Sequence, residues 1–269
     1  LFSWDFLCNL FFVLYFCKMS WFKEWFNTPY YHILYKDRDF VEAENFIRNL
    51  TQDLQLSKDS KIIDLACGKG RHSVFLQQLG YEVLGVDLSE ESIEHNKQFE
   101  TSADETPKLT FKVHDMRNEL YPNVSSEKVN AVFNLFTSFG YFDDDEDDRK
   151  VFSSVKNVLQ NDGIFVLDFL NEKFVKNTLV DETTVTKDGI DFLIKKRIEE
   201  NHVIKDIFFE DKGESFHYFE KVKLHTLEEI KNIAESFGFE AVKIWGNYQL
   251  EDFERETSPR CIFQFRVKN

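Results

Sequence analysis

The chain has 269 residues, of which 42% are hydrophobic and 30% are charged. This length and composition predict one folded α/β domain with elaborations and exclude a disordered chain. Its 33 basic and 48 acidic residues leave a net charge of -15, which repels phosphate backbones and disfavours a nucleic-acid partner.

Residues 1–19 form a hydrophobic N-terminal extension in which Asp5 is the only charged residue before Lys18. The segment is marginal in length for a membrane span, and it lacks the basic leading region and cleavage site of a secretory signal. Met19 resembles a natural start, so we expect the residues before it to be an upstream extension. A membrane anchor and a lid helix are the alternatives, and we expect no membrane partner.

Residues 20–56 are predicted to form a helical cap. The stretch from Phe40 to Leu54 has apolar residues at helical spacing. Such a segment ahead of the first core strand either covers a ligand mouth or docks on the sheet edge, and both interpretations stay open. Aromatic residues dominate the first part of the cap: Trp21, Phe22, Trp25, Phe26, Tyr30, Tyr31 and Tyr35.

The centre of the chain is a strand, a glycine turn and a helix. Residues 62–65 are an apolar run interrupted only by Asp64, and Gly68 and Gly70 follow. Residues 72–79 are predicted to form a helix. A second apolar strand, residues 81–86, ends in Asp87. In a β-α-β unit that carboxylate falls beside the glycine turn, where it can accept the hydroxyls of a ribose. The arrangement predicts a nucleoside-binding site.

Alternating elements continue through residues 57–269, which we predict to be one domain. The period-two pattern at about residues 180–225, with turn signals at Asp188-Gly189 and Lys212-Gly213, predicts a small antiparallel insert. The remaining expected elements are strands over residues 109–114, 129–135, 163–169, 239–245 and 261–267, and helices over 89–99, 145–159 and 226–237.

The four cysteines are scattered and form no C-x-x-C pair, so we expect neither a disulfide framework nor a metal site. They favour a reducing, cytoplasmic location. The residues are Cys8, Cys17, Cys67 and Cys261.

Four motifs in order resemble the class I S-adenosylmethionine-dependent methyltransferases. Asp64-Leu65-Ala66-Cys67-Gly68-Lys69-Gly70 is similar to their first motif, Asp87-Leu88-Ser89 to the second-strand acid, His114-Asp115-Met116 to the adenine loop, and Asn134-Leu135-Phe136 to the end of strand four. The resemblance implies a doubly wound, mostly parallel seven-stranded sheet whose last strand is antiparallel. It also implies S-adenosylmethionine as the cofactor. A nicotinamide oxidoreductase on the same sheet is the alternative, although Ser73 stands where its third glycine would be.

The resemblance also implies residue roles. The backbone from Cys67 to Gly70 would approach the methionine part of the cofactor, and Asp87 would hold the ribose hydroxyls. Leu88 and Met116 would enclose the adenine, and Asp115 would accept its exocyclic amine. The expected cofactor-binding residues are Asp64, Ala66, Cys67, Gly68, Gly70, Asp87, Leu88, Asp115, Met116 and Asn134.

A small acceptor is expected, because the segment after Asn134 lacks the Pro-Pro-aromatic pattern of base-amine methyltransferases and no Pro-Cys pair exists. Aromatic side chains and the insert are similar to the small-molecule branch of the family. The acceptor atom stays open between N and O. A protein that binds the cofactor without turnover also remains an alternative. The catalytic residue also stays open, with His72, His217 and Tyr218 as candidate bases. The pocket candidates are Tyr30, Tyr31, Phe139 and Tyr141.

Overall fold

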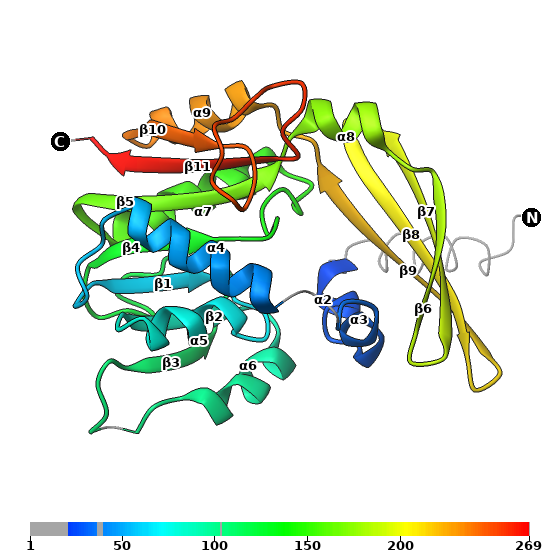
Figure 1. The fold of residues 1–269 in the computed structure, drawn as a ribbon, viewed down its shortest axis with the longest axis horizontal. Coiled ribbons are helices and arrows are strands. Elements are labelled where there is room, and N and C mark those ends of the chain that lie inside the picture. The colour runs from blue at the N-terminus through cyan, green and yellow to red at the C-terminus, as the bar shows by residue number, and fades with distance from the viewer. Residues whose placement is uncertain (1–20, 37–39, 103, 269) are drawn as a thin grey trace, which may run out of the picture.

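The computed structural model describes residues 21–36, 40–102 and 104–268. The hydrophobic N-terminal extension predicted over residues 1–19 lies outside this described part. The described chain contains two sheets, sheet A with seven strands and sheet B with four (Figure 1).

Sheet A is the central layer, with strand order β10-β11-β5-β4-β1-β2-β3. Neighbouring strands from β5 to β3 pair in parallel, and β11 runs antiparallel to both β5 and β10. This confirms the predicted fold, including the antiparallel last strand. The strands are β1 (Lys61–Leu65), β2 (Glu82–Asp87), β3 (Leu109–Val113), β4 (Val129–Asn134), β5 (Leu159–Leu170), β10 (Phe239–Trp245) and β11 (Arg260–Val267).

Helices cover both faces of sheet A because each carries one apolar stripe that must be buried. Phe46 and Leu76 belong to the core on one face, and Phe152 and Ile230 to the core on the other. The first face carries α4 (Phe40–Asp53), α5 (Arg71–Gln78) and α6 (Glu90–Asn96), the last continued by η1 (Lys97–Phe99), and the second carries α7 (Asp145–Val158) and α9 (Leu227–Ser236).

Sheet B is the predicted antiparallel insert, in the order β6-β7-β8-β9. The predicted turns at Asp188-Gly189 and Lys212-Gly213 join its strands, and both glycines have positive φ. A third turn at Glu200-Asn201 was not predicted, because neither residue is a glycine although both have positive φ. The strands are β6 (Glu182–Lys187), β7 (Ile190–Glu199), β8 (His202–Asp211) and β9 (Glu214–Lys223), and α8 (Glu172–Thr178), also not predicted, leads into them.

Two short helices, α2 (Trp21–Trp25) and α3 (Pro29–Leu34), lie between sheet A and sheet B (Figure 1). Trp25 and Leu34 pack with Phe192 and Ile207 on the inner face of sheet B. By contrast, α4 packs against sheet A and α5. The aromatic part of the predicted cap thus lies between the two sheets, whereas its last helix, α4, lies on sheet A.

The fifth strand differs from its predicted bounds. Asn161-Asp162-Gly163 suggests a turn that opens a strand, whereas β5 already begins at Leu159, directly after α7. Leu159 pairs with Val129, and the register shifts before the next pair. The turn-forming residues therefore make an irregularity within the strand, with Asp162 at a φ of 62°.

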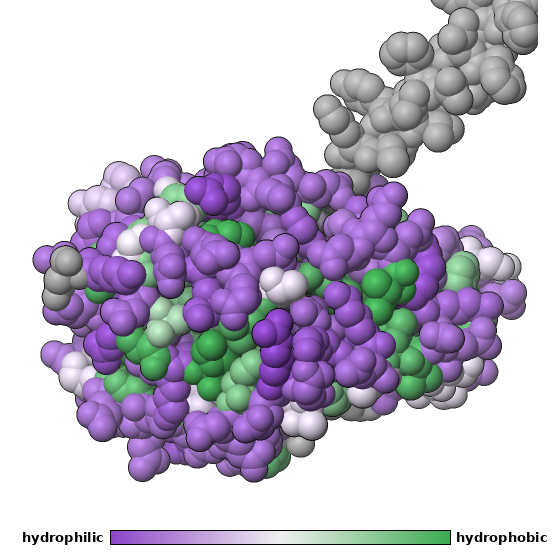
Figure 2. All heavy atoms as spheres, turned by 90° about the horizontal axis from the view of Figure 1, so that it is seen from above, coloured by the Kyte–Doolittle hydropathy of each residue, from purple (hydrophilic) through white to green (hydrophobic). Residues whose placement is uncertain are grey.

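The described surface is mainly hydrophilic on the face seen in Figure 2, with separate apolar patches, in keeping with the large net charge. None of the helices in the described ranges is both long enough and apolar enough to cross a bilayer.

Gly85 of β2 leaves room for the ring of Phe111, its partner residue on β3, beneath the glycine turn. A Cβ atom at this position would lie 2.5 Å from Cδ1 of Phe111, a buried ring on β3. We therefore expect Gly85→Ala to lower the free energy of unfolding by about 1–3 kcal/mol, because overpacking forces neighbours out of their rotamers. Urea unfolding measures the change. Adding Phe111→Leu should recover part of the loss, and an unchanged unfolding midpoint for Gly85→Ala would contradict the expectation.

Candidate functional site

A cavity of about 680 Å³ lies where β1, β2, β3 and β4 end. The carboxyl ends of parallel strands meet at one edge of a sheet, and the loops that follow them converge there. The cavity walls come from α2, α3, the glycine turn, α5, the segments after β2, β3 and β4, and Glu220 of β9. The predicted cofactor residues that line it are Ala66, Cys67, Gly68, Asp87, Leu88, Asp115 and Met116.

The glycine turn after β1 needs backbone conformations that side chains disfavour. Gly68 and Gly70 have φ values of 53° and 73°, in the left-handed region. A Cβ atom on Gly70 would lie 2.9 Å from the Phe111 ring, so Gly70 lies against the core rather than the cavity. A Cβ atom on Gly68 would meet nothing within 4 Å, so open space lies beside that backbone.

Asp87 fixes the turn from the end of β2. Its Oδ2 accepts the Gly68 N–H at 2.8 Å, and its Oδ1 accepts the Ser89 N–H at 2.8 Å. Each carboxylate oxygen has a second lone pair for a donor from the cavity. Burial raises the pKa of Asp87, and these backbone N–H groups oppose the rise. Asp87 thus lies beside the glycine turn, where its position at the end of the second strand predicted it.

Asp64 lies beneath the glycine turn and is absent from the cavity wall. Its Oδ2 accepts the Ser73 hydroxyl at 2.6 Å. Burial raises the pKa of Asp64 to about 6, against the hydrogen bond from Ser73. In this structure the carboxyl joins β1 to α5 and so supports the turn from below.

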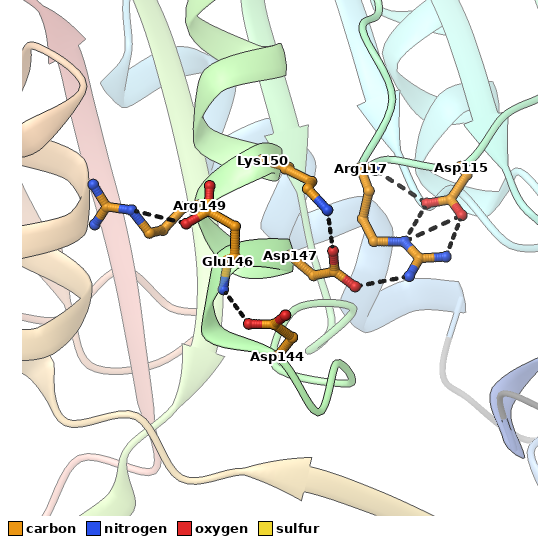
Figure 3. Close-up of polar contacts among 7 residues, drawn as sticks. All are labelled: Asp115, Arg117, Asp144, Glu146, Asp147, Arg149 and Lys150. Carbon is orange, nitrogen blue, oxygen red and sulfur yellow. Dashed lines mark hydrogen bonds and ion pairs between the residues drawn. The ribbon is translucent and has the colours of Figure 1, made fainter. Parts of the chain in front are cut away.

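Asp115, expected to accept an adenine amine, is already engaged by Arg117. The guanidinium binds both carboxylate oxygens, with Nη2 2.6 Å from Oδ2, while Nη1 reaches Asp147 of α7 at 2.9 Å (Figure 3). Burial alone would raise the pKa of Asp115, but the Arg117 hydrogen bonds outweigh it and lower that pKa. Lys150 also binds Asp147 at 2.7 Å. The Arg117 bridge, which was not predicted from the sequence, ties the loop after β3 to α7.

Asn134 is fully buried at the end of β4 and lies outside the cavity wall. Its Nδ2 donates to the Leu65 carbonyl at 2.9 Å, so it links β4 to the end of β1. Within the described ranges its Oδ1 has no hydrogen-bond partner. The next residues, Leu135 and Phe136, do line the cavity.

A buried network holds the loop after β4 in an unusual conformation. Phe136 and Thr137 have φ values of 61° and 59°, which non-glycine residues rarely adopt. Asp168 of β5 accepts the Phe136 N–H at 2.8 Å, and Arg260 of β11 donates to Asp168 at 2.8 Å and to Thr137 at 2.6 Å. The Tyr248 ring stacks on Phe136 at 4.8 Å. Long-range contacts therefore position this wall of the cavity.

The predicted pocket residues separate into two groups. Tyr31 and Tyr141 line the cavity. Tyr30 instead packs on Phe209 and donates to Asp211 at 2.9 Å, because its side of α3 faces sheet B. Phe139 is fully buried in the core beneath α7.

Among the candidate bases, His72 lines the cavity, 5.0 Å from the Phe136 ring. His217 stacks on Phe208 and binds Asp206 at 2.9 Å, and its side chain is 50% exposed. Tyr218 stacks on Trp25 within the core between α2 and sheet B. The sheet-B candidates thus lie away from the cavity wall.

Two asparagines that sequence reasoning missed support the site. Asn96 of α6 donates to the Gly68 carbonyl at 2.7 Å, and Asn27, between α2 and α3, accepts the Ser89 hydroxyl at 2.5 Å. Neither residue stands out in the sequence, because each supports the site through a contact with a residue far along the chain.

Residues 56–238 match the sequence model of the family described as a methyltransferase domain. The chain belongs to this methyltransferase family. The match covers the glycine turn, Asp87 and all four strands of sheet B.

Relatives and solved structures agree with this methyltransferase assignment. A glycine/sarcosine N-methyltransferase of Aphanothece halophytica is 32% identical over 134 residues, which are 50% of this chain and 48% of that protein. A Streptomyces venezuelae enzyme named dTDP-3-amino-3,4,6-trideoxy-alpha-D-glucopyranose N,N-dimethyltransferase is 25% identical over 210 residues, 75% of this chain and 83% of that protein. An S-adenosylmethionine-dependent methyltransferase from Clostridium acetobutylicum ATCC 824 superposes with a TM-score of 0.72 at 20% identity, covering 89% of this chain and 96% of that chain.

S-adenosylmethionine is therefore the cofactor of this methyltransferase, and the nicotinamide alternative is set aside. The cavity suits that molecule chemically. Asp87 has lone pairs for ribose hydroxyls, the backbone at Gly68 has open space beside it, and Leu88 and Met116 offer apolar surface to a flat base.

Proposed function

We propose that this methyltransferase transfers the methyl group of S-adenosylmethionine to a nitrogen atom of a small-molecule acceptor. The observation that carries the proposal is the cavity itself, which joins Asp87 and the glycine turn to a wall of aromatic side chains. One ligand can lie at the strand ends while a second lies against the rings, within the same cavity.

In this proposal Asp87 holds the ribose hydroxyls and the open backbone at Gly68 admits the methionine part. Leu88 and Met116 lie against the adenine, and Asp115, held by Arg117, borders it. Bound S-adenosylmethionine supplies a reactive methyl on a sulfonium, so this chain's residues mainly align the acceptor and exclude water. We assign supporting roles to the predicted residues that do not line the cavity: Asp64, Gly70 and Asn134.

We further propose that the aromatic part of the cap, residues 21–35, covers the acceptor end, with Tyr31 and Tyr141 facing the acceptor. The Asn27–Ser89 hydrogen bond ties this cap to the end of β2. A short cap that rests on both sheets shields the site from water.

A small amine is favoured as the acceptor over a nucleic acid. The net charge of -15 opposes phosphate backbones. The two relatives compared above are named for methyl transfer to nitrogen, one on glycine or sarcosine and one on an amino sugar. The buried thiols of Cys67 and Cys261 fit the reducing environment of the cytoplasm, where we place the protein.

Calorimetry and a transfer assay test this function. We expect S-adenosylmethionine and its demethylated product to bind the full chain with micromolar dissociation constants, and methyl transfer to occur with small amines in a panel of amines, alcohols and phenols. Absence of cofactor binding would overturn the proposal. Cofactor binding without transfer to any acceptor would instead support a binding protein without turnover.

A further inference from the structure

Sheet B adds one carboxylate to the acceptor end of the cavity. Among the described residues of its four strands, Glu220 of β9 alone lines the cavity wall. Its side chain is 18% exposed, so the carboxylate is largely withdrawn from solvent. This role was not predicted, because Glu220 lies in an alternating strand among several other charged residues.

Glu220 has capacity for one more donor. Its Oε1 accepts the Trp25 indole N–H at 2.9 Å and the Tyr35 hydroxyl at 2.6 Å. Its Oε2 lies 3.5 Å from the Lys205 ammonium, which is long for a charged hydrogen bond, and has no other partner in the described part of the chain. A carboxylate oxygen has two lone pairs, so Oε2 can accept a donor from the cavity.

The cavity wall next to Glu220 is a chain of aromatic rings. Tyr35 contacts Tyr31 with ring centroids 5.0 Å apart, Tyr31 contacts Phe26 at 4.9 Å, and Phe26 contacts Tyr141 at 5.6 Å. All four rings line the cavity. Ring faces carry negative charge density and attract cations, and ammonium ligands are bound in such aromatic surroundings.

We propose that Glu220 and this aromatic wall select an acceptor that carries an ammonium group. The ammonium donates to Oε2 of Glu220 and lies against the face of Tyr31. The Lys205 ammonium already lies over the Tyr35 ring, 4.5 Å from its centroid, and balances the Glu220 carboxylate until the acceptor arrives. A neutral hydroxyl can accept or donate at the same place, but it gains neither the charge interaction nor the cation–π attraction. Before transfer the ammonium gives one proton to Oε2 of Glu220, so that the neutral nitrogen has a free electron pair. This nitrogen bonds to the methyl carbon of S-adenosylmethionine while the carbon–sulfur bond breaks and leaves its electron pair on the sulfur of S-adenosylhomocysteine. This inference rests on the proposed function and names the residue that would choose between amine and alcohol acceptors.

The test compares benzylamine with benzyl alcohol, which have the same ring and differ in the charged group. Calorimetry is performed on the full chain saturated with S-adenosylhomocysteine. For the unsubstituted protein we expect benzylamine to bind at least about tenfold more tightly than benzyl alcohol, which corresponds to about 1.4 kcal/mol. In Glu220→Gln, which keeps the shape but removes the charge, the ratio should fall below about threefold.

Glu210→Gln is the matched control, since Glu210 lies exposed on the neighbouring strand β8 and contacts Ser215. It should keep the tenfold preference. The proposal is overturned if Glu220→Gln lowers only the melting temperature and leaves the ratio unchanged, or if the unsubstituted protein fails to prefer benzylamine. S-adenosylhomocysteine binding in the same samples distinguishes a failure of the proposed function from a failure of the role of Glu220. If the unsubstituted protein does not bind S-adenosylhomocysteine, the proposed function is contradicted. If it binds S-adenosylhomocysteine but does not prefer benzylamine, only the role of Glu220 is contradicted.

Discussion

Replacing Asp87 by alanine should weaken the binding of S-adenosylmethionine by at least about 100-fold. Hydrogen bonds to a charged group contribute about 1.5–3 kcal/mol each, and the carboxylate is placed to accept two hydroxyls. The substitution also removes the acceptor for the Gly68 and Ser89 N–H groups, so the glycine turn loses the contact that shapes it. Isothermal titration with cofactor and with its demethylated product measures the effect.

Two further variants separate charge from general damage. Asp87→Asn keeps one acceptor oxygen and should fall between the alanine variant and the unsubstituted protein. Glu82→Gln changes a carboxylate at the opposite end of the same strand, where it lies 3.7 Å from Lys61, and should leave cofactor affinity unchanged. Micromolar cofactor binding by a folded Asp87→Ala protein would refute the role that we propose for this residue.

The region around Asp87 could be predicted because its elements are consecutive in the sequence. A strand, the glycine turn, a helix and a second strand follow one another within residues 61–87. Because the two strands pair in parallel, with Asp64 beside Gly85, the last residue of the second strand, Asp87, lies next to the turn that follows the first. Apolar patterns of this kind determine which face and which end of a strand each residue occupies. The seven-stranded sheet and its antiparallel last strand followed from the resemblance, and the insert followed from the period-two pattern, whereas the strand order was not predicted.

The acceptor end could not be predicted in the same way, because its residues meet only through tertiary packing. Glu220 reaches Trp25 across 195 positions of the chain, and Arg260 reaches Asp168 across 92. Phe139 has the same aromatic character as Tyr141 and lies only two residues away, yet it is buried in the core while Tyr141 lines the cavity. A high aromatic content indicates a segment that contributes to the acceptor end, but it does not predict which of its rings faces a ligand.

The ion pair of Asp168 and Arg260 is one such contact between residues that lie far apart in the sequence. Asp168 is fully buried, and the Arg260 side chain is only 13% exposed. Both groups also bind the loop after β4, where Phe136 and Thr137 keep their left-handed conformations. Such conformations persist only where the surroundings hold them, so the pair both stabilises the fold and shapes one wall of the cavity.

We therefore expect Asp168→Ala to lower the free energy of unfolding by about 3–5 kcal/mol, because it leaves the buried Arg260 charge without its partner. Urea unfolding monitored by circular dichroism gives the value. Replacing both residues, Asp168→Leu with Arg260→Leu, should be less destabilising than Asp168→Ala, since no unpaired charge remains. The double variant should still lose methyl-transfer activity, because the Phe136 N–H and the Thr137 hydroxyl lose their partners and the loop relaxes. A loss below about 1 kcal/mol in Asp168→Ala, or full activity in the double variant, would mean that the loop keeps its conformation without this pair.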